Sequence, residues 1–328
     1  MQRFKNILCV VETDGECFPA LERAVTLAEN NQASLTVIDL SGLAGESFAM
    51  PTNKEIATEI RVAMKNSRQQ KLESLVNPYR KQVKIQTKVL YGTPFLEIVR
   101  EVLRNEHDLV IKIPEKQDWL DRLFGSNDMH LLRKCPCPVW LIKPTAPKSY
   151  RCVLAAIDID ENFPETGNVI KTNHALSLQI LEIASSLALS DFAELHIVHT
   201  WEAFAENTLR GLRIQTSEAQ IESYIKQVKH QHESEMNALI RDATSHLSEE
   251  SLNYLKPRKH LVKGSARKEI PAVVKRINAD LVVMGTVART GIPGFIMGNT
   301  AETIINQIDC SVLAIKPPGF VSPVTLER

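Results

Sequence analysis

The sequence lacks the features that mark membrane proteins and nucleic-acid-binding proteins. No apolar stretch is long enough for a signal peptide or a membrane span. The 39 Lys and Arg residues are balanced by 39 Asp and Glu residues, whereas broad electrostatic binding to nucleic acid needs an excess of positive charge. We therefore expect a cytoplasmic protein without a membrane or nucleic-acid partner.

Cysteine is also scarce, with six residues in a chain of 328. A chain of this length with so few cysteines does not form a disulfide framework, so we expect reduced thiols. Cys135 and Cys137 are closely spaced, but no second Cys or His pair completes a zinc pattern. Two pairs of nearby histidines have spacings that do not place both rings on one face of a strand or helix: His196 with His199, and His230 with His232. The sequence thus predicts no metal site.

Two loop motifs of common hydrolases are missing as well. The chain has no Gly-x-x-x-x-Gly-Lys-Ser/Thr phosphate loop and no Gly-x-Ser-x-Gly nucleophile elbow. No general base, nucleophile or set of metal ligands can be named. We expect a protein that is not an enzyme, and slow ATP hydrolysis stays as an alternative.

What the chain does contain is an internal repeat. Residues 5–14 align with residues 151–160 at an offset of 146, and both segments have the pattern of a strand ending in an acid. Residues 137–144 align with residues 310–317 at an offset of 173. Self-similarity of this kind indicates a duplicated structural unit. We expect one unit at residues 1–147 and a second at residues 148–328.

Each half alternates continuous apolar runs with amphipathic helical stretches, which is typical of a parallel sheet covered on both faces. The sequence therefore predicts an α/β fold of two tandem Rossmann-like domains, each a five-stranded parallel sheet with helices on both faces. A long polar helix is expected after the second strand of each half, around residues 56–75 and 221–247. Thr93 and Ser265 are expected to be N-caps of later helices.

A glycine-containing stretch, residues 284–302, stands out in the second half. It joins an apolar strand to a helical pattern and holds four glycines, at Gly285, Gly291, Gly294 and Gly298. Glycine lets a backbone approach a ligand closely, and the first turn of a helix offers free N–H groups to an anion. The stretch predicts a phosphate site. An alternative without a ligand is a helix cap, because Asn299 followed by Glu302 resembles a capping box.

The order of these segments resembles the universal stress protein family, whose fold is Rossmann-like and adenine nucleotide alpha hydrolase-like. The nucleotide signature of that family is a Gly, two residues, a Gly, nine residues, and then Gly followed by Ser or Thr. Gly285, Ala288, Gly298 and Asn299 stand at those positions with the spacing kept. Ala288 replaces the second glycine and Asn299 the hydroxyl residue, and the methyl group of alanine would crowd a phosphate oxygen.

The resemblance covers both halves and implies a regulatory stress-response protein that binds ATP or another adenine nucleotide in the second half. By this resemblance the nucleoside would be contacted by Asp158, Met284 and Gly285. Adenine would be contacted by Thr200 or, with a shifted alignment, by Val198. The phosphates would be contacted by Ala288, Gly298, Asn299 and Thr300. Two alternatives stay open. Asp158 has the position of a turn acid that caps a helix, and Arg289 either meets a phosphate or is an exposed loop arginine.

The first half departs further from the family pattern. Ile113 and Pro114 stand where the second half has Gly285 and Thr286, and they remove both room and an N–H donor. We expect no nucleotide site in residues 1–147, where Gly125 and Ser126 would remain only as a helix cap. A rival hypothesis is a scaffold with a decayed site that holds a small hydrophobic ligand or a protein partner.

Each half closes on an apolar strand, at residues 139–142 and 312–315. Because family dimers associate through the last strand, we expect these two strands to pair and to make the chain an intramolecular pseudo-dimer. Pairing would protect two apolar edges at once. A homodimer of the whole chain is a further possibility that the resemblance leaves open.

Overall fold

The computed structural model describes residues 4–13, 17–41, 54–115, 126–159, 167–211, 217–286 and 297–326. The first half contains β1 (Asn6–Val11), α1 (Phe18–Asn31), β2 (Ser34–Ser41), α2 (Lys54–Val76), a 3-10 turn (Asn77–Tyr79), β3 (Ile85–Tyr91), α3 (Pro94–Asn105), β4 (Leu109–Lys112), α4 (Ser126–Lys134) and β5 (Val139–Leu141). The second half contains β6 (Cys152–Ala156), α5 (Gly167–Asp191), β7 (Glu194–Trp201), α6 (Glu206–Gly211), α7 (Glu218–Thr244), α8 (Glu249–Leu255), β8 (Arg258–Lys263), α9 (Ala266–Ile277), β9 (Leu281–Gly285), α10 (Asn299–Ile305) and β10 (Ser311–Ile315).

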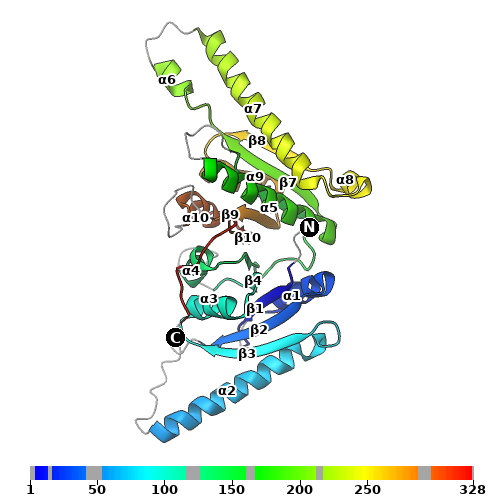
Figure 1. The fold of residues 1–328 in the computed structure, drawn as a ribbon, viewed down its shortest axis with the longest axis vertical. Helices are drawn as coiled ribbons and strands as arrows, with labels where there is room; N and C mark the ends of the chain where they lie inside the picture. The colour runs from blue at the N-terminus through cyan, green and yellow to red at the C-terminus, as the bar shows by residue number, and fades with distance from the viewer. Residues whose placement is uncertain are drawn as a thin grey trace.

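Within the described residues the strands form one ten-stranded sheet in the order β3-β2-β1-β4-β5-β10-β9-β6-β7-β8. The five strands of each half are parallel to one another, as the sequence predicts. β5 and β10 pair in antiparallel fashion, with Leu313 opposite Trp140. The two closing strands therefore join the halves into one continuous sheet, with α2 and α7 at the far ends of the molecule (Figure 1).

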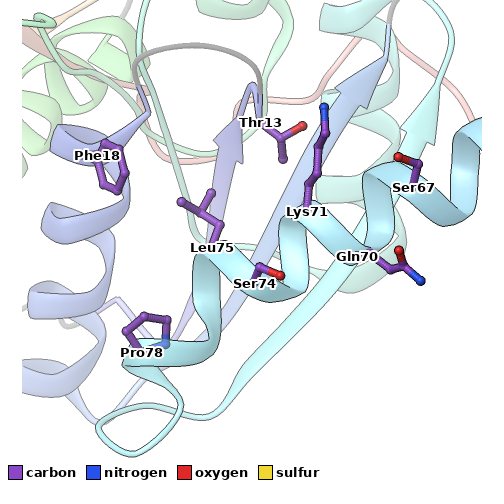
Figure 2. Close-up of a pocket in the computed structure, with 8 residues that line it drawn as sticks. All are labelled: Thr13, Phe18, Ser67, Gln70, Lys71, Ser74, Leu75 and Pro78. Atoms are coloured by element: carbon purple, nitrogen blue, oxygen red, sulfur yellow. The ribbon is translucent and has the colours of Figure 1, made fainter.

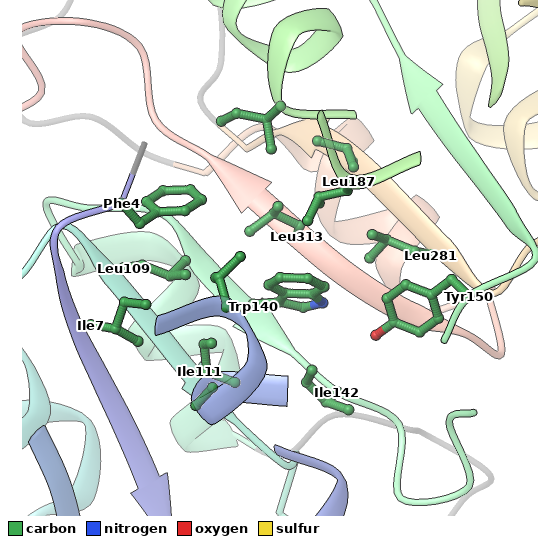
Figure 3. Close-up of a cluster of buried hydrophobic side chains, with 14 of the residues drawn as sticks. Phe4, Ile7, Leu109, Ile111, Trp140, Ile142, Tyr150, Leu187, Leu281 and Leu313 are labelled. Atoms are coloured by element: carbon green, nitrogen blue, oxygen red, sulfur yellow. The ribbon is translucent and has the colours of Figure 1, made fainter. Parts of the chain in front are cut away.

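Helices cover both faces of this sheet, and the helix faces that the sequence marks as apolar are buried. One cluster of buried side chains includes residues of α1, α2, α5 and α7, and the other includes residues of α3, α4, α9 and α10. Trp140 lies in the first cluster between side chains of the first half, such as Ile111, and side chains of the second, such as Leu313 (Figure 3). In the part of the chain that the structure describes, no helix is long and apolar enough to cross a membrane.

A buried ion pair also ties the halves together. Nη1 of Arg23 on α1 lies 2.8 Å from the carboxylate of Asp191 at the end of α5, and each side chain is 7% exposed. Nη2 of Arg23 donates to the carbonyl of Lys148, and the N–H of Tyr150 donates to Asp191, each at 2.7 Å. The Arg23 guanidinium lies 4.3 Å from the centre of the Tyr150 ring. One salt bridge therefore fixes α1, α5 and the segment that connects the halves.

The two predicted N-caps are at their expected places. Thr93 precedes α3 and Ser265 precedes α9, although neither side chain makes a capping hydrogen bond. The glycines before them, Gly92 and Gly264, have φ of 141° and 138°, a conformation that is strained for residues with a Cβ. The repeated glycine after the third strand of each half therefore has a backbone reason that involves no ligand.

Candidate functional site

The second half opens a pocket of about 850 Å³ at the carboxyl ends of β6 and β7, beside α7. In open α/β sheets this edge is where ligands bind. Its wall is made by residues that follow or end the strands, by residues of α7, and by the starts of α9 and α10; they include Asp158, Thr200, Trp201, Phe204, Tyr224, Gln231, His232, Ser265 and Thr300.

Three of the side chains that the resemblance implies lie together in this wall: Asp158, Thr200 and Thr300. The backbone at Asp158 is held by Ser177 of α5, which accepts from the Asp158 N–H at 3.3 Å and donates to its carbonyl at 2.9 Å. Thr300 accepts a long hydrogen bond of 3.4 Å from Nε of Arg267 in the first turn of α9. An acid and two hydroxyl groups therefore line one pocket, and a guanidinium outside its wall is hydrogen-bonded to one of the hydroxyl groups.

Other implied residues lie elsewhere. Val198 and Met284 are buried in the hydrophobic core, and neither contributes to the pocket wall. Gly285 is a point of close packing, because a Cβ there would lie 2.8 Å from Cδ2 of Leu176 on α5. That contact explains this glycine without a ligand. Ala288 and Arg289 lie outside the described residues.

The alternative reading of a capping box at Asn299 is wrong. Gly298 is the N-cap of α10 and its N–H donates to the Thr286 carbonyl at 3.0 Å, while Asn299 is the exposed first residue of the helix. No side chain caps α10. The Glu302 carboxylate that would complete the box instead accepts two hydrogen bonds of 2.7 Å from Nη2 of Arg133 on α4. The Glu302 carboxylate is therefore engaged by a charged partner from the other half of the protein, in hydrogen bonds that are stronger than neutral ones.

A histidine pair in the pocket has no counterpart among the residues expected from the sequence. Nε2 of His199 on β7 lies 3.1 Å from Nδ1 of His232 on α7, and both rings are buried. Burial and the adjacent His232 lower the pKa of His199 to about 4, although Asp158 acts in the opposite direction. Burial also lowers the pKa of His232. The spacing of residues along one strand or helix does not predict this pair, because His199 lies on β7 and His232 on α7.

The depressed pKa of His199 predicts a loss of stability in acid. Above pH 6.5, the unperturbed value, the ring is neutral in both the folded and unfolded states; as the pH falls toward 4, only the unfolded chain takes up the proton. We expect wild-type protein to lose about 2 kcal/mol more free energy of unfolding between pH 7 and pH 5 than His199→Gln. Urea unfolding at the two pH values measures this difference.

His230→Gln is the matched control, because His230 is an exposed residue of the same helix as His232. Between pH 7 and pH 5 this variant should lose as much free energy of unfolding as wild type does. An acid-induced loss in His199→Gln as large as that of wild type would show that the buried ring is not the source.

The first half has a different arrangement at the same edge of the sheet. Nζ of Lys112, at the end of β4, lies 2.5 Å from Oδ1 of Asp128 in the first turn of α4, and the N–H of Glu115 donates to Oδ2 at 2.8 Å. Asp128 is 0% and Lys112 5% exposed. The Asp128 carboxylate is thus paired with a buried lysine of the same half. That the first half has no nucleotide site stays a prediction.

A hollow of about 570 Å³ in the first half lies between the start of α1 and α2, away from the end of β4. Phe18 stands on one side and Lys71, Ser74 and Leu75 of α2 on the other (Figure 2). Thr13, at the end of the hollow, donates its hydroxyl proton to the buried Asp39 at 2.8 Å. This hollow contains none of the residues that the sequence singles out.

Comparison with known proteins agrees with this architecture. The universal stress protein family model matches residues 3–143 and 170–316. The chain is 29% identical to universal stress protein E of Escherichia coli K12 over 336 residues, covering 100% of this chain and 98% of that protein. It is equally similar to universal stress protein E of Photorhabdus laumondii over 335 residues, covering 99% of this chain and 98% of that protein.

Solved structures show the same fold. A protein of unknown function from Pseudomonas aeruginosa PAO1 superposes with a TM-score of 0.62 at 23% identity, covering 96% of this chain and 93% of that one. A universal stress protein from Archaeoglobus fulgidus superposes with a TM-score of 0.55 at 17% identity, covering 95% of this chain and 98% of that one. Because the family model matches both halves of the continuous sheet, the chain belongs to the universal stress protein family.

Proposed function

We propose that this protein is a regulatory stress-response protein of the cytoplasm that binds an adenine nucleotide such as ATP in its second half and is not an enzyme. The observation that carries the proposal is the convergence of Asp158, Thr200 and Thr300 on one pocket at the carboxyl ends of β6 and β7. Its volume of about 850 Å³ is in the range of ligand sites.

The chemistry of the wall suits the parts of a nucleotide. The Asp158 carboxylate can accept hydrogen bonds from ribose hydroxyl groups. The ring of Tyr224 offers an apolar face to a base. Arg267, hydrogen-bonded to Thr300 at the start of α10, supplies a positive charge for phosphate.

The test is calorimetric titration of the full-length protein with ATP, comparing wild type with Ser265→Trp. Ser265 lines the pocket and its side chain makes no capping hydrogen bond, so the indole would occupy ligand space. We expect binding by wild type and at least tenfold weaker binding by the variant.

Thr93→Trp is the matched control, because Thr93 is the N-cap of α3 as Ser265 is of α9. It should bind ATP as wild type does. Absence of binding by wild type at millimolar ATP would reject the nucleotide proposal, and equal binding by Ser265→Trp would reject this pocket. Phosphate release in the same samples should not exceed that of ATP in buffer.

The aromatic wall supports a second candidate, a small hydrophobic ligand. Trp201, Phe204 and Tyr224 line the pocket, and Phe204 is 88% exposed. Among the described lining residues there is no Lys or Arg. Mass spectrometry of compounds extracted from the purified protein distinguishes the candidates, since an apolar compound that is absent from Ser265→Trp would favour the second.

A further inference from the structure

The link between α4 and β5 brings two thiols together. Cys135 and Cys137 are each followed by proline, which restricts the backbone on both sides of the pair. The Cys135 N–H donates to the Leu131 carbonyl at 2.9 Å and so closes the last turn of α4. The two Sγ atoms lie 3.6 Å apart. Cys135 is 0% and Cys137 7% exposed, so the two thiols form a buried pair.

A buried lysine from the other half accompanies this dithiol. Lys316 follows β10, is buried, and reaches the last turn of α4, directly before Cys135. Its Nζ donates to the Leu132 carbonyl, and to Oγ1 of Thr286 at 3.0 Å, and it lies 4.7 Å from the centre of the Phe320 ring. Among the residues that the structure describes, no carboxylate pairs with Lys316. A buried ammonium without a negative partner is costly.

The repeat provides an internal comparison. Lys143 is the residue of the first half that aligns with Lys316, and it follows β5 as Lys316 follows β10. Nζ of Lys143 has a carboxylate partner, Oδ1 of Asp309, at 2.8 Å. Asp309 aligns with Pro136, the residue between the two thiols. Lys143 thus receives a carboxylate from the second half, whereas the aligned segment of the first half offers Lys316 no carboxylate and has two thiols.

We propose that Cys135 and Cys137 bind one Cu(I) ion as a dithiolate, with the ammonium of Lys316 as its counter-charge. Thiolate sulfur is a soft ligand that suits Cu(I), zinc and iron–sulfur clusters. Binding forms two Cu–S bonds and releases the two thiol protons to solvent, so no electron is transferred. The resulting complex carries one negative charge, which the single positive charge of Lys316 balances.

The coordination number favours a monovalent ion over zinc. Structural Zn²⁺ takes four protein ligands, and no group of three or more His, Cys, Asp or Glu that could hold a metal occurs in the described parts of the chain. Two thiolates suffice for Cu(I). The second half cannot form the same site, because Ile308 and Cys310 stand where the first half has Cys135 and Cys137.

The experiment is a titration of the reduced full-length protein with Cu(I) under anaerobic conditions, in competition with a chromogenic Cu(I) chelator. We expect wild type to withdraw one equivalent from the chelator, and Cys135→Ser and Cys137→Ser to lose that equivalent. Cys310→Ser, which removes a buried thiol with no thiol neighbour two residues away, should keep it. Lys316→Met should bind the same equivalent at least tenfold more weakly, because the complex then lacks its counter-charge.

X-ray absorption of wild-type protein with one equivalent of Cu(I) provides a measurement that does not depend on how the variants fold. Two sulfur neighbours and no nitrogen or oxygen are expected around the metal. Failure of wild type to compete with the chelator, full binding by either single serine variant, or nitrogen or oxygen neighbours at the metal would each overturn the proposal.

Discussion

Replacing Asp191 with alanine is expected to lower the free energy of unfolding by about 3–5 kcal/mol, because it leaves a buried guanidinium without its counter-charge. Nη1 of Arg23 lies 2.8 Å from the Asp191 carboxylate, and both side chains are buried. The same substitution removes the acceptor of the Tyr150 N–H, which adds the cost of an unsatisfied buried donor. Urea unfolding of full-length protein, followed by circular dichroism, measures the change.

The control for this variant is Glu22→Ala, in the same region. Glu22 precedes Arg23 on α1, and its carboxylate lies 3.9 Å from Nζ of the exposed Lys148. An exposed pair of this kind contributes about 0–1 kcal/mol. If Asp191→Ala were no more destabilising than Glu22→Ala, the salt bridge between the halves would not contribute to stability as its burial implies.

Asp128→Ala is the second substitution for which we expect a large effect, a loss of about 3–5 kcal/mol, because Lys112 would stay buried without its partner. The expected loss again comes from the charge left behind and not from the pair itself. For this reason Asp309→Ala, which breaks the Lys143–Asp309 pair with its largely exposed carboxylate, should cost less than about 1 kcal/mol.

The repeat supplies a rescue for this variant. Met284 and Ala301 stand in the second half where Lys112 and Asp128 stand in the first. The double variant Lys112→Met with Asp128→Ala therefore introduces a pair that the protein already uses, and replacing both charges by apolar groups is often neutral. We expect it to recover most of the stability lost in Asp128→Ala. A double variant as unstable as Asp128→Ala would show that the carboxylate acts through its hydrogen bond to the Glu115 N–H.

Local patterns made some of the site predictable. Asp158 and Thr200 lie in the pocket because residues at the ends of parallel strands meet at one edge of a sheet. Gly285 is at a position where a Cβ does not fit, but the neighbouring atoms belong to Leu176. The glycine spacing of the family signature thus identified a position that has no room for a side chain. Only the packing of α5 showed that a leucine, and not a ligand, fills the space beside it.

The sequence by itself determined the duplication, the α/β class, the parallel strands of each half and the family, since each depends on periodicity, turn residues and motif order that neighbouring residues carry. Only the tertiary structure showed which titratable side chains contact one another. His199 meets His232 across 33 residues and Arg23 meets Asp191 across 168, and Nζ of Lys316 donates to the Leu132 carbonyl of the other half across 184. Such contacts depend on how helices are placed over a shared sheet and on the antiparallel joining of β5 and β10. No spacing along one strand or helix encodes that placement.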